Sequence, residues 1–220
     1  MKKIMHIKRQ LNSNSESYYE DFVYESDNEN ATIATALLTT PVIWEHSCLQ
    51  KKCGACAMVI NGKPALACNT RLADTDCEII NIEPLQKFPV IQDLRVDRQA
   101  LMDKLKELKV WLESDSINGN ENISYEASRC LECGLCLEVC PNYYMDGKFG
   151  GMAAMTPLAR IIDKASKDQR KELKKNYKKG VYNSCGKSLA CRDICPAKID
   201  IDKLLVKSNA AAIWNRWNKE

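Results

Sequence analysis

Short stretches of alternating apolar and polar positions fill the first hundred residues, and this pattern predicts β-strands. The turn-forming run Asn61-Gly62-Lys63-Pro64 separates two of these stretches and predicts a hairpin. The expected strands are Lys3–Arg9, Tyr18–Tyr24, Ala57–Ile60, Ala65–Ala67 and Glu78–Ile82, with one short helix at Thr32–Leu38. Five strands and one helix in this order predict a small mixed sheet.

The apolar spacing becomes helical beyond residue 97, where Leu101, Leu105, Leu108 and Leu112 recur three or four residues apart. Residues 84–97, with two prolines, are interpreted as a linker, and the polar residues 114–124 as a loop. The clearest later helices are expected at Pro157–Ala165 and Ile201–Trp217. The apolar face of the last one is expected to pack internally, through Leu204, Leu205, Ile213, Trp214 and Trp217. The pattern predicts two domains, residues 1–96 and 97–220.

Residues 167–179 form a strongly basic run, with seven basic and two acidic side chains. A solvated helix is the favoured interpretation of this run. The alternative is contact with an anionic membrane surface or a partner.

Composition and charge narrow the class of protein. The chain has 220 residues, 45 % hydrophobic and 28 % charged, with a net charge of +3 that is too small to argue for nucleic acid binding. No apolar region follows the basic start MKKIMHIKRQ, and no apolar run is long enough to span a membrane. Export is therefore not expected. The chain has 12 cysteines, and so many are predicted to serve mainly as metal ligands rather than in disulfides.

The first cysteine group has the spacing CxxxxCxxC followed by one distant cysteine, and comprises Cys48, Cys53, Cys56 and Cys68. Plant-type ferredoxins hold a [2Fe–2S] cluster with this spacing, two thiolates for each iron. Gly54 lets backbone amides approach the cluster sulfides. Zinc fits less well, because structural zinc sites usually pair CxxC with a second CxxC or with histidines, and the chain has only His6 and His46.

The second and third groups resemble each other. Cys130, Cys133, Cys136 and Cys140, followed by Pro141, form the bacterial ferredoxin run CxxCxxCxxxCP. The third group repeats this run as Cys185, Cys191, Cys195 and Pro196, with Ser188 where the middle cysteine belongs. In a two-cluster ferredoxin the fourth cysteine of each run ligates the other cluster.

Crossed ligation assigns Cys130, Cys133, Cys136 and Cys195 to a [4Fe–4S] cluster. Only three thiolates remain for the other site, from Cys140, Cys185 and Cys191. A cube with three thiolates can lose one iron, so the sequence predicts a [3Fe–4S] cluster with its vacant corner at Ser188. The alternative is a [4Fe–4S] cluster completed by the Ser188 oxygen or by water. Cys77 belongs to no group and is expected to be a buried small hydrophobe.

With these three groups in this order, the sequence resembles the iron–sulfur subunits of succinate dehydrogenases and fumarate reductases. The resemblance covers nearly the whole chain and is carried by SCLQKKCGACAMVINGKPALAC, CLECGLCLEVCPN and CGKSLACRDICP, with FPVIQDLRVDRQ between the two modules. It implies an α+β chain, with a β-grasp ferredoxin domain followed by an all-α dicluster ferredoxin domain.

The resemblance also implies partners and a location. A flavoprotein subunit would carry covalent FAD and the dicarboxylate site, and a membrane anchor, commonly with haem, would help to bind quinone. This chain would relay electrons between them through [2Fe–2S], [4Fe–4S] and [3Fe–4S] clusters, in either direction. It would be a peripheral subunit at the cytoplasmic face of a bacterial inner membrane.

Two positions depart from the family near the quinone. The stretch after the first Cys-Pro lacks the tryptophan common in the family, and Gly186 stands where a histidine is frequent. The candidates on the quinone side are Tyr143, Tyr144 and Lys187. His46 replaces a common arginine and is interpreted as an ordinary loop residue. Two alternatives remain: the same relay with another substrate or a thiol–disulfide acceptor, and a free soluble ferredoxin.

Overall fold

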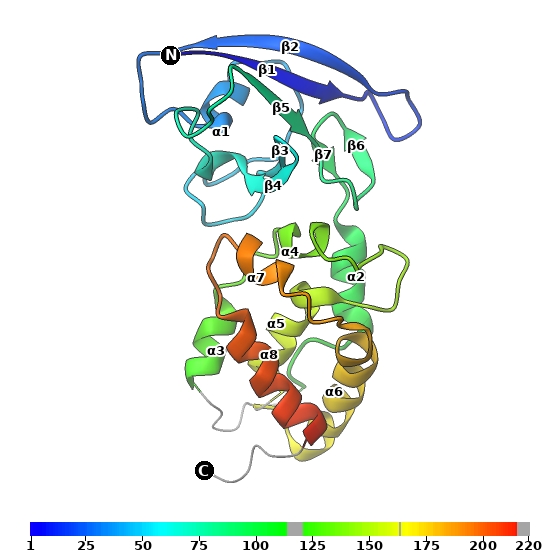
Figure 1. Ribbon diagram of the computed structural model, residues 1–220. Coiled ribbons are helices and arrows are strands. Elements are labelled where there is room, and N and C mark those ends of the chain that lie inside the picture. Colours follow the sequence, from blue (N-terminus) through cyan, green and yellow to red (C-terminus); the bar gives the residue numbers. More distant parts are fainter. Residues whose placement is uncertain (114–120, 163, 215–220) are drawn as a thin grey trace. The chain divides into compact units, whose positions relative to one another are not determined.

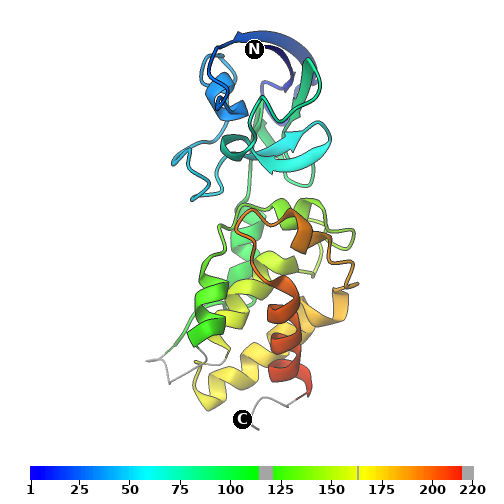
Figure 2. The ribbon, with the colours of Figure 1, turned by 60° about the vertical axis from the view of Figure 1, so that its left-hand side comes forward.

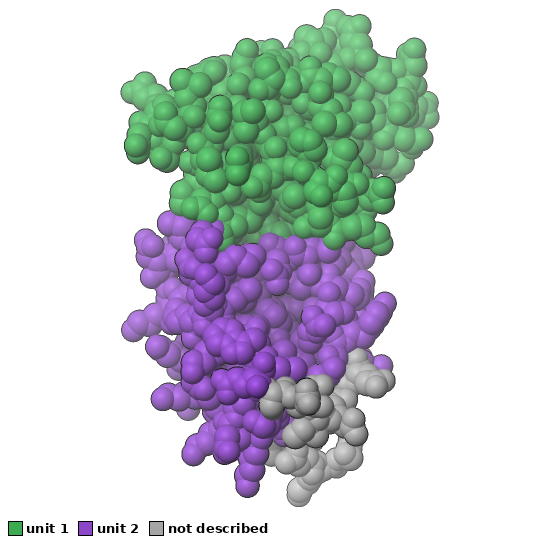
Figure 3. Space-filling view, turned by 180° about the vertical axis from the view of Figure 1, so that it is seen from behind, with its two compact units in different colours: residues 1–98, 133–138 green, residues 99–132, 139–220 purple. Residues whose placement is uncertain are grey.

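A computed structural model describes residues 1–113, 121–162 and 164–214 of the chain, which divides into two compact units (Figures 1 and 3). The first unit comprises Met1–Arg98 together with Cys133–Glu138. The second comprises Gln99–Glu132 and Val139–Glu220. Residues Cys133–Glu138, which belong to the second cysteine group, are therefore part of the strand-rich unit.

A five-stranded mixed sheet forms the body of the first unit, in the order β2-β1-β5-β3-β4 (Figure 1). Strand β1 is parallel to β5 and antiparallel to β2, whereas β3 is antiparallel to both β4 and β5. The expected strands are confirmed, with ends shifted by at most two residues. They are β1 (Lys2–Arg9), β2 (Tyr18–Glu25), β3 (Ala57–Ile60), β4 (Lys63–Leu66) and β5 (Ile79–Glu83).

Alternation along the strands places every second side chain in the core of this unit. Met5 and Ile7 of β1 are buried, and so are Ile80 and Ile82 of β5. The expected short helix is α1 (Ile33–Leu37), which also buries most of its side chains. Thr32 and Thr35 begin it with a reciprocal capping box, since each side chain accepts a hydrogen bond from the other's backbone N–H.

The linker interpretation of residues 84–97 is wrong, because this stretch contains a hairpin of β6 (Val90–Gln92) and β7 (Arg95–Val96). Leu85, Phe88 and Leu94 are buried beside it. The strands are too short for an alternating pattern to stand out, and both prolines precede them. The turn depends instead on long-range hydrogen bonds, from Asp93 N to the carbonyl of Gln10 and from Leu94 N to that of Ile43.

Helices form the second unit, and α5 lies among the others, in contact with α2, α3, α6 and α8 (Figure 2). Eight of its eleven residues are buried. Within the described residues, no helix is long and apolar enough to cross a membrane. The elements are α2 (Gln99–Glu107), α3 (Glu121–Ser128), α5 (Gly151–Ile161), α6 (Lys167–Gly180), η2 (Tyr182–Ser184), α7 (Ala190–Ile194), α8 (Ile201–Asn209) and a π-helical turn, η3 (Ala210–Trp214).

Several helix boundaries differ from the prediction. Helix α5 begins six residues before Pro157, which the sequence pattern placed at its start. Helix α3 occupies residues 121–124 of the expected loop, and residues 114–120 lie outside the described residues. Leu204 and Leu205 pack internally as expected, but Trp214 is 47 % exposed. Trp217, assigned to the same face, is outside the described residues.

Candidate iron–sulfur cluster sites

Two cysteine pairs come together in the first unit, around the β3–β4 hairpin. Cys56 directly precedes β3 and Cys68 lies in the 3-10 turn η1 (Ala67–Asn69) that follows β4. A hydrogen bond from Ala67 N to the Cys56 carbonyl, 3.0 Å long, holds the two segments side by side. The Cys68 and Cys56 thiols interact directly, as do those of Cys53 and Cys48. Two adjacent pairs are what a two-iron cluster requires.

The loop between Cys48 and Cys53 directs its backbone amides at sulfur. Gln50 N and Lys52 N donate to Cys48 Sγ at 3.3 and 3.2 Å, and Lys51 N donates to Cys68 Sγ at 3.3 Å. Leu49 and Lys51 adopt left-handed conformations to achieve this, with φ of 53° and 60°. Such donors favour a negatively charged sulfur, so the loop is suited to hold a reduced, anionic cluster.

The pKa values of the Cys48 and Cys56 thiols are shifted in opposite directions, each for a physical reason. Hydrogen bonds from the Gln50 and Lys52 amides lower the pKa of Cys48 to about 7. Burial raises the pKa of Cys56 to about 12. Cys48 is thus prepared as a thiolate near neutral pH, whereas Cys56 needs the positive charge of a metal to lose its proton.

Cys133 and Cys136, of the second cysteine group, lie in the segment Cys133–Glu138 that belongs to the first unit. Helix α4 (Leu135–Glu138) follows Cys133, and the Glu138 carboxylate accepts hydrogen bonds from Gln86 N at 2.9 Å and Lys87 N at 3.0 Å. Gly134 has φ +84°, and a Cβ there would lie 3.1 Å from the Phe88 ring. The segment that contains Cys133 and Cys136 is therefore packed and hydrogen-bonded against residues 85–88. Sequence reasoning missed Glu138, because its partners lie about fifty residues away.

Three cysteines come together in the second unit. Burial raises the pKa of Cys191 to about 11, with further contributions from the charges of Cys140 and Cys185. These three are the residues that the sequence assigns to the three-iron site. Ser188 is exposed, between the left-handed residues Lys187 and Leu189 that lead into α7. Among the described residues, no three His, Cys, Asp or Glu side chains converge as one mononuclear metal ion would require.

A buried tyrosine supports the three-cysteine site from α6. The Tyr177 hydroxyl donates to Asn209 Oδ1 at 2.7 Å, which ties α6 to α8. Burial raises the pKa of Tyr177, and the charge of Cys185 adds to this effect. Tyr177 therefore remains a neutral donor beside the site.

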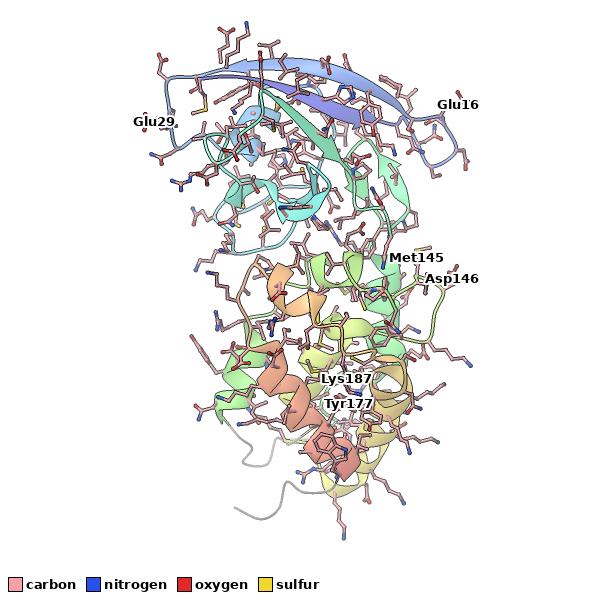
Figure 4. The ribbon with its side chains drawn as sticks, in the orientation of Figure 1. Glu16, Glu29, Met145, Asp146, Tyr177 and Lys187 are labelled. Atoms are coloured by element: carbon pink, nitrogen blue, oxygen red, sulfur yellow. The ribbon has the colours of Figure 1, made fainter. Side chains whose placement is uncertain are left out.

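The candidates on the quinone side divide by exposure. Tyr143 is 3 % exposed and Tyr144 is 69 % exposed. The Lys187 Nζ lies 5.6 Å from the centre of the Tyr182 ring. Figure 4 labels Lys187 and, apart from it in this view, Met145 and Asp146 of the loop after Cys140. A Cβ at Gly186 would lie 3.0 Å from Asn142 Oδ1, so a larger residue there requires this loop to shift.

The structure also tests the sequence interpretations of Cys77 and His46. The expectation that Cys77 is buried is wrong, since it is exposed and Asn61 Nδ2 donates to its Sγ at 3.2 Å. It lies just before β5, outside the alternating part of the strand that faces the core. His46 is exposed and stacks on the Trp44 ring, with centroids 4.4 Å apart.

Comparisons with known proteins agree with this arrangement. Residues 4–103 match a family of 2Fe-2S iron–sulfur cluster binding domains, and residues 126–199 match a 4Fe-4S dicluster domain. The chain is 33 % identical to the succinate dehydrogenase iron–sulfur subunit of Bacillus subtilis, over 92 % of this chain and 89 % of that protein. It is 32 % identical to the fumarate reductase iron–sulfur subunit of Haemophilus influenzae, over 71 % and 70 %.

A solved structure shares the fold. A chain of the Mycobacterium smegmatis Sdh1 complex superimposes with a TM-score of 0.79 at 22 % identity, over 99 % of this chain and 98 % of that one. Fold and sites thus define a two-module iron–sulfur electron-transfer protein. The chain belongs to the family of iron–sulfur subunits of succinate dehydrogenases and fumarate reductases. The expected fold class and the expected role as an electron-relay subunit of an oxidoreductase are confirmed.

Proposed function

We propose that the chain carries three clusters and relays electrons between a flavoprotein with covalent FAD and quinone at a membrane anchor. When bound, the clusters act as one-electron carriers. The chain sets the distances between the clusters and tunes their reduction potentials. The assigned ligands are Cys48, Cys53, Cys56 and Cys68 for [2Fe–2S], Cys130, Cys133, Cys136 and Cys195 for [4Fe–4S], and Cys140, Cys185 and Cys191 for [3Fe–4S].

One observation carries the proposal beyond an ordinary ferredoxin: Cys140 and Cys185 both lie close enough to Cys191 to raise its pKa, and the fourth position is the exposed Ser188. Three soft sulfur ligands without a fourth favour a three-iron cluster over a complete cube. The same chain also offers two pairs for [2Fe–2S] in its first unit.

The flavoprotein, the anchor and the peripheral position at the cytoplasmic face of a bacterial inner membrane belong to this proposal. Haem would reside on the anchor. Tyr144 and Lys187 are proposed on the quinone side because both are exposed and follow cysteines of the three-cysteine site, Cys140 and Cys185, whereas Tyr143 is buried. A thiol–disulfide acceptor is the second candidate, favoured by Gly186 where the family often has histidine, since a Cβ at this position would lie 3.0 Å from Asn142 Oδ1.

Affinity purification of the tagged chain from its native membranes tests the proposal. We expect a subunit that stays fluorescent with covalent flavin in a denaturing gel, and cluster reduction by succinate. The Cys191→Ser variant should retain the flavoprotein and lose one cluster. A chain that elutes alone near its 24.9 kDa mass, without flavin, would show a free carrier. Reoxidation of the reduced complex by a disulfide but not by quinone would favour the second candidate.

A further inference from the structure

The helix α6 separates its residues into two faces. Gln169, Leu173, Tyr177 and Gly180 are buried. The opposite face is exposed and carries Lys167, Lys171, Lys175 and Lys178. At 3.6 residues per turn, these four lysines lie within an arc of about 80°. The basic run seen in the sequence is therefore a single stripe, called here the lysine face.

The lysine face has little acidic compensation. Only Asp168 and Glu172 are acidic in α6, and the Glu172 carboxylate is paired at 2.8 Å with Lys109 outside the helix. In the part of the chain that the structure describes, none of the four lysines forms an ion pair. A helix that only needs solubility usually mixes both signs along its exposed face. The lysine face is thus suited to an anionic partner.

Two of the segments that pack beside α6 carry an exposed tryptophan. The carbonyl of Trp111, a residue 44 % exposed, accepts a hydrogen bond from Gln169 Nε2 at 2.7 Å. Trp214, also half-exposed, ends η3, which packs against α6. Tryptophan prefers the boundary between lipid headgroups and acyl chains, where its ring is partly apolar and its N–H stays hydrated.

We propose that the lysine face of α6 contacts the surface of a bilayer that contains anionic phospholipids. Lysines without acidic partners gain about a fivefold increase in binding for each charge near such a surface. Trp111 and Trp214 favour lipid over an acidic protein or a nucleic acid as the partner. Their rings can add apolar contact with lipid to the binding free energy, and a polar surface would not provide that contact. This contact concerns lipid and not the electron path, so it goes beyond the proposed function.

Vesicle sedimentation of the full chain with its clusters tests the proposal. The probes are vesicles of phosphatidylcholine alone and of phosphatidylcholine mixed with phosphatidylglycerol. We expect binding to the mixed vesicles only, and loss of binding when salt rises from about 0.1 M to about 0.5 M. The variant Lys171→Gln/Lys175→Gln/Lys178→Gln should bind about a hundredfold more weakly.

The matched control, Lys63→Gln/Lys106→Gln/Lys203→Gln, removes the same charge from exposed positions outside α6. Equal weakening of both triple variants would overturn the proposal, and so would the absence of binding to anionic vesicles or equal binding to both vesicle types. Visible absorption of the clusters should be the same in all three proteins. A failure of the electron-relay proposal would alter the cluster spectra or the redox partners, and would leave the vesicle result unchanged.

Discussion

Asp93 shows how one buried carboxylate organises the first unit. It is 1 % exposed, and its Oδ1 accepts from Arg9 Nε at 2.9 Å and Gln10 N at 3.1 Å, while Oδ2 accepts from Ile43 N at 2.9 Å. It thereby joins the end of β1, the segment before the [2Fe–2S] loop and the β6–β7 turn. Nearby charge and hydrogen bonds compensate for its burial.

Replacing Asp93 should therefore destabilise the first unit. Asp93→Ala removes the two oxygens that accept three hydrogen bonds and leaves the largely buried Arg9 without its inner partner, so we expect the free energy of unfolding to fall by about 3 kcal/mol. Urea unfolding, followed by the loss of [2Fe–2S] absorption, measures this. Asp21→Ala is the control, since Asp21 is exposed and, among the described residues, has its ion pair with His6 alone, and should change stability by less than about 0.5 kcal/mol. Equal effects would contradict the assigned role.

Cys77 provides the opposite case at the residue scale. Cys77 is exposed, and the Asn61 side-chain amide donates a hydrogen bond to its Sγ. Cys77→Ala should leave all three cluster signals and the iron content unchanged, as measured by electron paramagnetic resonance (EPR) and iron analysis. Loss of any one signal would show that Cys77 is a ligand, and the cysteine assignment would need revision.

At the scale of elements, Glu138 ties α4 to residues 86–87. Glu138→Ala removes the two oxygens that accept from the Gln86 and Lys87 amides. Because each of the two hydrogen bonds to the charged carboxylate contributes about 1.5 kcal/mol, we expect roughly a hundredfold faster loss of the [4Fe–4S] signal in air. The [2Fe–2S] signal should be unaffected. The exposed Asp146→Ala is the control, and similar losses in both variants would contradict this role of Glu138.

We expect the loop before α7 to determine which cluster the second unit holds. Ser188 occupies the position of the missing cysteine, and Leu189, with φ 58°, begins α7. Ser188→Cys should supply a fourth thiolate, convert the three-iron site to a four-iron one and lower its potential. EPR of the oxidised protein would then lose the three-iron signal. An unchanged spectrum would show that Ser188 is not the vacant corner.

Elements with a clear period were predictable from the sequence, and elements held by distant contacts were not. Strands β1 and β5 show alternation, and the hairpin after β3 has its own turn residues. The β6–β7 hairpin was missed because its strands are very short and its turn depends on Asp93. The start of α5 was misplaced because Pro157 is typical of a first turn, yet here it lies inside a buried helix.

The candidate sites show the same division. The cysteine groups depend on local spacing, so the sequence sufficed to propose their ligands. The amides of Gln50, Lys51 and Lys52 that point at sulfur depend on left-handed residues that composition does not reveal. Glu138 could not be found either, because it acts on amides of another segment.

At the scale of the whole molecule, the two units differ in chemistry. The first unit is a sheet with amides directed at a two-pair cysteine site, and the second is a helical unit with a three-cysteine site and a basic face on α6. One chain thus combines a site suited to an anionic two-iron cluster with a site that lacks one thiolate. This combination is the basis of the relay proposed for the chain.

Low-temperature EPR of the purified complex, oxidised in air and then reduced stepwise, tests the relay most directly. We expect a three-iron signal in the oxidised state, followed on reduction by one [2Fe–2S] and one [4Fe–4S] signal. The Ser188→Cys variant should lose the first signal alone. Absence of the oxidised signal in undamaged complex, together with a second [4Fe–4S] signal on reduction, would contradict the account, because a complete cube would then occupy the site of Cys140, Cys185 and Cys191.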